Sequence, residues 1–306
     1  MVVPERELPL IDLSQSDSSV VEQLDEVYRT LGFAGLVNHG ADRALLDAAF
    51  EASRRFHALP TEAKHAIELN DSHRGFIAQG TSTDAASEYE EITQPNQSES
   101  FMMLGPIPQG RFLDGPNQWP ELEGVRAAIE AYHAEATQLA RRVIGLFAAV
   151  LDAPLADHFE MPTAWLRLLR YPPQSDQAST YGSAPHRDYG AITLLAQDGV
   201  AGLEVLTPEG TWLDVPGDTD MLVLNLGEVM HRWSNGSLLR TPHRVRNRSN
   251  GERYSMPFFF DPDMRSTIEP MASCVPAGQA PAFEPVSFED FVRGELTAGY
   301  DRHAAS

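Results

Sequence analysis

Cysteine is almost absent from this chain, since Cys274 is the only one among 306 residues. An intrachain disulfide needs two cysteines, so a secreted domain held together by disulfides is excluded. Long apolar runs are also missing, and none approaches the ~18 residues that span a bilayer. Residues 1–7 have neither the basic nor the apolar region of a secretory signal. We therefore expect a cytoplasmic protein that does not enter a membrane.

Basic residues are scarce. Lys and Arg number 23 against 44 Asp and Glu, which gives a formal net charge of −21. Such a surface repels the phosphates of nucleic acids and the headgroups of anionic lipids. We therefore expect no nucleic-acid or membrane partner, and a small-molecule substrate is favoured. The composition leaves the oligomeric state open.

The pattern of apolar residues changes along the chain. Helical spacing dominates the first half, whereas short apolar runs separated by Pro, Gly, Asn and Asp fill the second. Helices are predicted at 20–31, 43–59, 61–69, 121–151 and 288–302. Strands are predicted at 8–13, 33–39, 165–171, 191–197, 203–206, 211–215, 221–226, 243–246 and 253–260. This pattern favours a mainly β fold with flanking helices and a double-stranded β-helix (jelly roll) core.

Two parts of the chain are expected to form one compact unit. Residues 1–120 are the helical and strand region packed on the core, and residues 121–306 form the double-stranded β-helix region. Residues 79–100 are rich in Ser, Thr, Gln and Glu. A polar segment of this length is either a lid over a site or a solvated surface loop.

The sequence His186-Arg187-Asp188 is followed 55 positions after Asp188 by His243. Side chains two apart on a strand point to one face, so we expect His186 to open a strand that directs both side chains to one point. Two imidazoles and a carboxylate are the facial-triad ligands, which leave half the positions of an octahedral iron open. We therefore predict that His186, Asp188 and His243 bind Fe(II).

Arg253 and Ser255 follow this third ligand and share one face of a predicted strand. An arginine offers a planar fork of donors, and a serine adds a hydroxyl donor. Together they suit the distal carboxylate of a dicarboxylate such as 2-oxoglutarate. The pattern is that of an oxygenase that uses Fe(II), 2-oxoglutarate and O2.

Further motifs surround these residues. They are Leu8–Leu13, Gly32–Gly40, Arg170–Pro173, Asn225–Glu228, Trp233–Gly236, Thr241–Val245 and Arg253–Phe259. With them the chain resembles the isopenicillin N synthase-like family of 2-oxoglutarate/Fe(II) dioxygenases over most of its length. The resemblance implies oxidation of a substrate C–H bond, by hydroxylation, desaturation or cyclisation, with release of succinate and CO2. The plant and bacterial members act in biosynthesis, so an antibiotic or other natural-product intermediate is one expected substrate.

The resemblance also implies roles for other residues. Tyr171 matches a tyrosine that assists the 2-oxoglutarate carboxylate or faces the substrate, although a core tyrosine is equally consistent. Leu169 stands where many plant members carry Asn, so the pocket beside the iron is expected to be more apolar. Phe259 lies on the inward face with Ser255 and is expected to border the substrate.

Three residues before the β-rich half are also candidates for substrate binding. Arg74 stands where related enzymes place an arginine in the pocket, although a surface charge is the competing interpretation. Phe101 and Met103, on a strand after the polar segment, are expected to line the pocket or to belong to the core.

Two other functions remain open from the sequence. An oxidase or oxidative cyclase of the same fold would bind a substrate carboxylate with Arg253 and Ser255 and would use no 2-oxoglutarate. A non-catalytic jelly roll would bind a small acidic metabolite but would need no complete set of iron ligands.

Overall fold

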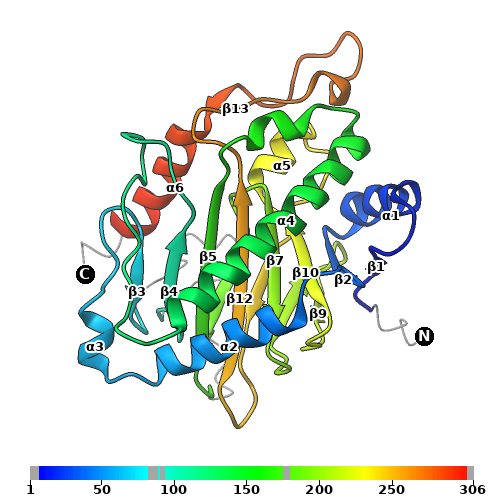
Figure 1. The fold of residues 1–306 in the computed structure, drawn as a ribbon. Coiled ribbons are helices and arrows are strands. Elements are labelled where there is room, and N and C mark those ends of the chain that lie inside the picture. Colours follow the sequence, from blue (N-terminus) through cyan, green and yellow to red (C-terminus); the bar gives the residue numbers. More distant parts are fainter. Residues whose placement is uncertain (1–6, 82–88, 90–93, 175–179, 302–306) are drawn as a thin grey trace.

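Two β-sheets packed face to face form the centre of the protein (Figure 1). The computed structural model describes residues 7–81, 89, 94–174 and 180–301. The larger sheet has the order β1-β2-β10-β7-β12-β5-β4-β3. Its strands are β1 (Leu10–Asp12), β2 (Phe33–Val37), β10 (Leu222–Leu226), β7 (Ile192–Gln197), β12 (Arg253–Asp261), β5 (Thr163–Tyr171), β4 (Glu99–Leu104) and β3 (Gly75–Ile77). The smaller sheet consists of β6 (Ser183–His186), β11 (His243–Val245), β8 (Leu203–Leu206) and β9 (Trp212–Asp214).

The path of the chain confirms the predicted jelly roll. From β5 to β12 the chain passes repeatedly between the two sheets, so that strands distant in sequence become neighbours. In the larger sheet β12 pairs with β5 and β7, and β10 pairs with β7, all antiparallel. Apolar side chains from both sheets, among them Leu169, Val205 and Val245, fill the space between them.

Helices cover the outer face of the larger sheet. Figure 1 shows α4 (Val125–Leu151) and α2 (Arg43–His57) crossing in front of its strands, with α1 (Asp17–Thr30) beside β2. α4 buries residues three or four apart, from Val125 through Ile129 and Tyr132 to Leu151, which is the stripe that a helix lying on a sheet requires. None of the described helices is long and apolar enough to cross a membrane.

The remaining elements are short or lie near the C-terminus. They are α3 (Thr61–His65), α5 (Glu228–Trp233), β13 (Thr267–Ile268), β14 (Val286–Ser287) and α6 (Phe288–Asp301). The sequence predicted α1, α2, α3, α4 and α6 to within four residues at each end but missed α5, β3, β6, β13 and β14. Most of the predicted polar segment, 82–88 and 90–93, lies outside the described residues. Strands from the first 120 residues complete the larger sheet, and the division at residue 120 stays a prediction.

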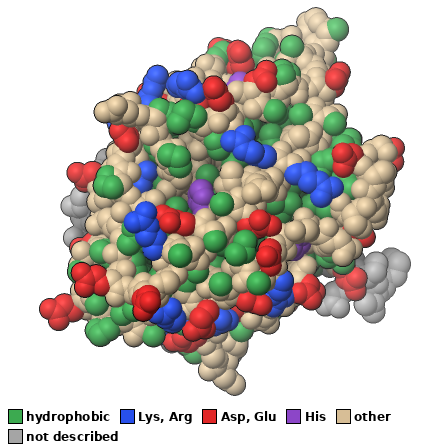
Figure 2. Space-filling model, in the orientation of Figure 1, with side chains coloured by type: hydrophobic (Ala, Val, Ile, Leu, Met, Phe, Trp, Pro, Cys, Tyr) green, Lys and Arg blue, Asp and Glu red, His purple; other side chains and the backbone are tan. Residues whose placement is uncertain are grey.

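Basic side chains near the third predicted ligand do not form a free patch. Arg240 pairs with Glu228, while Arg244 and Arg248 both pair with Glu204. On the face shown in Figure 2, basic and acidic side chains lie interspersed. These pairs involve three of the four arginines between residues 240 and 248.

Candidate active site

A cavity lies between the two sheets. The larger sheet contributes side chains from β5, β7, β10 and β12, and the smaller sheet contributes side chains from β6, β8 and β11. Its wall combines apolar groups with a small set of polar groups from distant parts of the chain. This is the usual construction of a small-molecule site.

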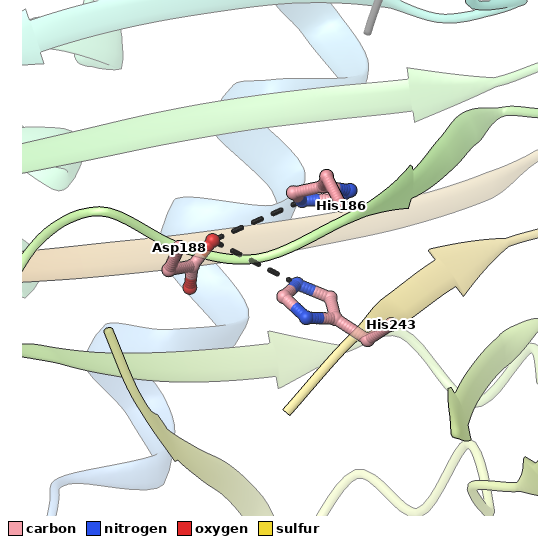
Figure 3. A group of neighbouring side chains, drawn as sticks. All are labelled: His186, Asp188 and His243. Carbon is pink, nitrogen blue, oxygen red and sulfur yellow. Dashed lines mark ion pairs between the residues drawn. The ribbon is translucent and has the colours of Figure 1, made fainter. Parts of the chain in front are cut away.

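His186, Asp188 and His243 converge at this cavity (Figure 3). Their ligand atoms all lie within 4.8 Å of one another. Asp188 Oδ1 is 3.8 Å from Nε2 of His186 and 3.7 Å from Nε2 of His243. His186 and His243 come from neighbouring strands, because β6 and β11 pair with these two residues opposite each other.

The main chain determines which nitrogen of each imidazole carries the proton. Nδ1 of His186 lies 2.7 Å from the carbonyl oxygen of Ala184, and Nδ1 of His243 lies 3.3 Å from that of Thr241. A carbonyl oxygen only accepts, so Nδ1 donates in both rings and the lone pair of the neutral imidazole lies on Nε2. Both Nε2 atoms face Asp188, which is the orientation that a metal ligand needs.

Asp188 is held through its other oxygen. Asp188 Oδ2 accepts hydrogen bonds from Thr193 Oγ1 at 2.6 Å and from Asn225 Nδ2 at 2.7 Å. Burial opposes ionisation, but the neighbouring imidazoles and these two donors together keep the pKa of Asp188 below its ordinary value. The carboxylate is therefore ionised at neutral pH and turns Oδ1 toward the two histidines.

The predicted backbone position of His186 and Asp188 is corrected by the structure. His186 ends β6 rather than opening a strand, and Asp188 lies in the connection to β7. Strand alternation therefore does not orient Asp188. Hydrogen bonds from Thr193 and Asn225 do so instead.

Arg253 and Ser255 lie on the cavity wall formed by β12. Arg253 is fully buried, and burial lowers the pKa of its guanidinium. Its Nη2 donates to Gln197 Oε1 at 2.9 Å and its Nε donates to the Val200 carbonyl at 3.1 Å. Its Nη1 has no hydrogen-bond partner among the residues that the structure describes. A buried donor without a partner is costly, so this atom points to a bound acceptor.

The site fits both groups that the sequence implies. Two neutral imidazoles and one carboxylate, within reach of a single ion, suit Fe(II). The Nη1 atom of Arg253, with Ser255 beside it on the same face, suits a carboxylate of 2-oxoglutarate. In both cases specific polar atoms would contact the bound group: the Nε2 atoms and Asp188 Oδ1 would contact the ion, and Arg253 Nη1 would contact the carboxylate.

Three further predicted residues lie at the cavity. Tyr171 is buried beside Arg253, whose guanidinium carbon lies 4.9 Å from the centre of its ring. Leu169 pairs with Ser255 across β5 and β12, and Phe259 lies further along β12. These side chains share the inward face of the larger sheet, as alternation predicted.

Arg74, Phe101 and Met103 are not among the described residues that line this cavity. Arg74 is buried elsewhere, and its guanidinium donates to the carbonyls of Ser72 and Leu113. This pairing with loop carbonyls replaces both predicted interpretations, a pocket residue and a surface charge.

Phe101 and Met103 point to the opposite face of the sheet. Ser100, not Phe101, pairs with Leu169, and opposed residues share a face. The ring of Phe101 packs 5.0 Å from that of Phe56 on α2. The structure therefore places both residues in the core, which is the second of the two predicted alternatives, and not in the pocket.

Several residues of the site were not predicted from the sequence. Thr193 and Asn225 hold Asp188, and Gln197 holds Arg253. Asn225 belongs to the Asn225–Glu228 motif, for which no role was predicted. Thr193, Gln197 and Asn225 share the inward face of their strands, so alternation counted from Leu195 and Val223 would have found them.

Family models match two segments of the chain. Residues 162–262 match the model described as 2OG-Fe(II) oxygenase superfamily. Residues 8–122 match the model described as non-haem dioxygenase in morphine synthesis N-terminal. The first segment contains the three converging residues and the Arg253–Ser255 pair.

Relatives resemble the chain over nearly its whole length. A 2-oxoglutarate-Fe(II) type oxidoreductase of Emericella nidulans, hxnY, is 35% identical over 97% of this chain and 91% of its own length. Clavatol oxidase of Penicillium crustosum is 30% identical over 96% of both chains. A full-length Neurospora crassa protein, crystallised in complex with alpha-KG and thymine, has a TM-score of 0.84 and 26% identity, and the match covers 96% of this chain and 97% of that chain. The chain therefore belongs to the 2-oxoglutarate/Fe(II) oxygenases and is a dioxygenase that depends on Fe(II) and 2-oxoglutarate.

Proposed function

We propose that His186, Asp188 and His243 hold the Fe(II) ion and that Arg253 and Ser255 hold the distal carboxylate of 2-oxoglutarate. The observation that carries the second assignment is the buried Nη1 atom of Arg253, which lacks a partner among the described residues. When bound, iron and 2-oxoglutarate activate O2 with release of succinate and CO2. Each of these five residues then has a separate role in positioning the iron, the 2-oxoglutarate and the substrate.

The histidines and Asp188 present one ligand atom each, because their other polar atoms are already bonded. Arg253 presents its Nη1 atom from a fixed position, because Gln197 and the Val200 carbonyl hold its Nη2 and Nε atoms. Such prior orientation reduces the entropy lost when cosubstrate and substrate meet. Apolar walls at Leu169 and Phe259 exclude water from the reacting C–H bond.

The proposed substrate is a small-molecule metabolite or natural-product intermediate, oxidised by hydroxylation, desaturation or cyclisation. The name of clavatol oxidase and the thymine bound to the Neurospora crassa protein point to small molecules in related proteins. A net charge of −21 disfavours nucleic acid. The lone cysteine and the ferrous ion suit a reducing compartment, so the cytoplasm is the proposed location.

The test is carried out with the purified protein without oxygen. Addition of Fe(II) and then 2-oxoglutarate should produce a visible charge-transfer band, and Arg253→Met should lose the band at the same 2-oxoglutarate concentration. With oxygen and a substrate, succinate should appear in proportion to oxidised product. If product forms without succinate, Arg253 instead binds a carboxylate of the substrate, as in an oxidase that uses no 2-oxoglutarate.

A further inference from the structure

Arg167 is a second arginine on the cavity wall, and the proposed function gives it no task. It lies on β5, where residues 167, 169 and 171 alternate onto the inward face. Leu169 and Tyr171 of this set are buried, whereas Arg167 is half-buried and therefore still reaches the open space.

One hydrogen bond orients the Arg167 side chain. Its Nε donates to Ser100 Oγ at 2.8 Å, and Ser100 is fully buried on β4. Among the described residues, no carboxylate pairs with Arg167 and neither of its Nη atoms has a hydrogen bond. A guanidinium held through Nε presents its two Nη donors as a fork, which matches a carboxylate in two parallel hydrogen bonds.

Arg167 and Arg253 are held toward opposite sides of the cavity wall. Nε of Arg167 donates to Ser100 on β4, whereas Nη2 of Arg253 donates to Gln197 on β7, and β12 and β5 lie between these two strands. Arg253 pairs with Tyr171, four residues from Arg167 along β5. Four residues of a strand span about 13 Å. The two arginines therefore serve two different anionic groups, of which 2-oxoglutarate supplies the one at Arg253.

Arg167 and Thr193, which holds Asp188, both line the cavity and lie two strands apart in the larger sheet. Phe258 pairs with Leu166, so Arg167 is level with Pro257 on β12, and Pro257 pairs with Leu195 on β7. Two residues before Leu195, Thr193 holds Asp188. Two strand spacings, about 10 Å, thus separate the backbone of Arg167 from the strand that supports the iron ligand. A small molecule spans this distance.

We propose that the primary substrate is a small carboxylic acid and that Arg167 binds its carboxylate. The apolar part of the acid lies against Leu169, Leu195 and Phe259, with the reacting C–H bond toward Asp188. This inference rests on the proposed function, because it assigns Arg253 to 2-oxoglutarate. Ser100 is then a positioning residue for Arg167.

The test compares acids with their uncharged amides. The probes are phenylacetate, 4-methylbenzoate and octanoate with the corresponding primary amides. Each is titrated calorimetrically, without oxygen, into the iron-loaded protein at saturating 2-oxoglutarate, which keeps Arg253 occupied. For at least one pair the acid should bind at least about tenfold more tightly than the amide, the loss expected for one charge-assisted contact.

Variants at Arg167 identify the source of this preference. Arg167→Gln should abolish the preference for the acid, and Arg167→Lys should retain part of it because the charge remains without the fork. The matched control is Arg126→Gln on the exposed side of α4, which removes the same charge from a surface ion pair and should leave the preference unchanged.

Three outcomes would overturn the assignment of Arg167. They are equal binding of acids and amides, a preference that persists in Arg167→Gln, and binding of none of the three acids. The charge-transfer band of the wild-type protein separately reports 2-oxoglutarate binding. Absence of that band would count against the proposed function. The calorimetric comparison of acids with amides is a separate measurement and tests only the role of Arg167.

Discussion

The buried charged residues on the two faces of the larger sheet differ in how completely the protein itself supplies their hydrogen-bond partners. On the cavity face, the fully buried Arg253 has one donor atom without a partner in the described part of the chain. On the helix face, the buried Glu99 receives Lys64 Nζ at 2.8 and 2.9 Å, Arg170 Nη1 at 3.0 Å and His57 Nδ1 at 3.1 Å. Only the second charge is satisfied by the protein itself.

This difference indicates a binding site at Arg253 and a structural contact at Glu99. Burial opposes ionisation of Glu99, but hydrogen bonds from His57, Lys64 and Arg170 lower its pKa to about 2. The cluster joins α2, α3, β4 and β5, so its interaction energy is available to folding. Arg253 makes only part of its possible contacts in the protein alone, and the remainder is available to a ligand.

Removal of the Asp188 carboxylate, a proposed iron ligand on the cavity face, should have the largest effect. We expect Asp188→Ala to fold and to lose iron affinity by on the order of 10³-fold, about a third of a typical metal-site binding energy, with no detectable turnover. Iron content after dialysis and succinate release measure this. The matched control on the helix face is Glu99→Gln, which should retain iron. Full activity of Asp188→Ala would remove it from the ligand set.

Arg253→Met should raise the 2-oxoglutarate requirement while iron binding stays near normal. Loss of one partner of a buried charged contact costs about 2–4 kcal/mol, which corresponds to an increase of roughly 30-fold or more in KM for 2-oxoglutarate. Initial rates at increasing 2-oxoglutarate measure it. If the initial rate depends on 2-oxoglutarate as in the wild type, Arg253 does not bind this cosubstrate. The difference between the two faces of the sheet would then have no functional meaning.

Glu99→Gln should lower stability rather than activity. The folded-state pKa of about 2 lies below the ordinary 4.5, so the wild type has this contribution above pH 4.5 and loses it as the pH falls toward 2. The shift corresponds to about 3 kcal/mol at neutral pH. Chemical denaturation of both proteins between pH 3 and 7 measures the difference. Glu130→Gln, from an exposed pair with Arg126, is the control and should change stability little.

The smallest effect is expected for the group that orients Asp188. Thr193→Val keeps the shape but removes the hydroxyl that donates to Asp188 Oδ2. Such supporting groups change metal affinity by about 10–100-fold. Iron titration measures it, with Thr137→Val on α4 as the control. Unchanged iron affinity would mean that Asn225 alone holds the carboxylate.

The jelly roll and the positions of the converging residues were predictable, because each rests on strong local patterns. The orientation of β4 was not. Phe101, Met102, Met103 and Leu104 form a continuous apolar run, so alternation carries no signal about which face is inward. The placement of Asp188 outside β6 was also not predicted, because the sequence does not show the hydrogen bonds from Thr193 on β7 and Asn225 on β10 that hold its carboxylate.

The contacts of Arg74 show a second limit. Its guanidinium donates to carbonyls of loop residues up to 39 positions away, among them Leu113. Loop carbonyls have no residue-type signature, so a sequence cannot indicate that they will meet an arginine. Arg167 is the opposite case, because alternation from Tyr171 already places it on the inward face.

The main-chain contacts of the two imidazoles limit how this centre can be adjusted. Ala184 and Thr241 supply carbonyl oxygens to the Nδ1 atoms, and no side-chain replacement removes a carbonyl. Point mutations therefore have little control over the basicity of either histidine. Thr193 and Asn225, by contrast, contact Asp188 through side chains. Side-chain substitutions that tune the proposed iron site are therefore expected to act mainly through the contacts of Asp188.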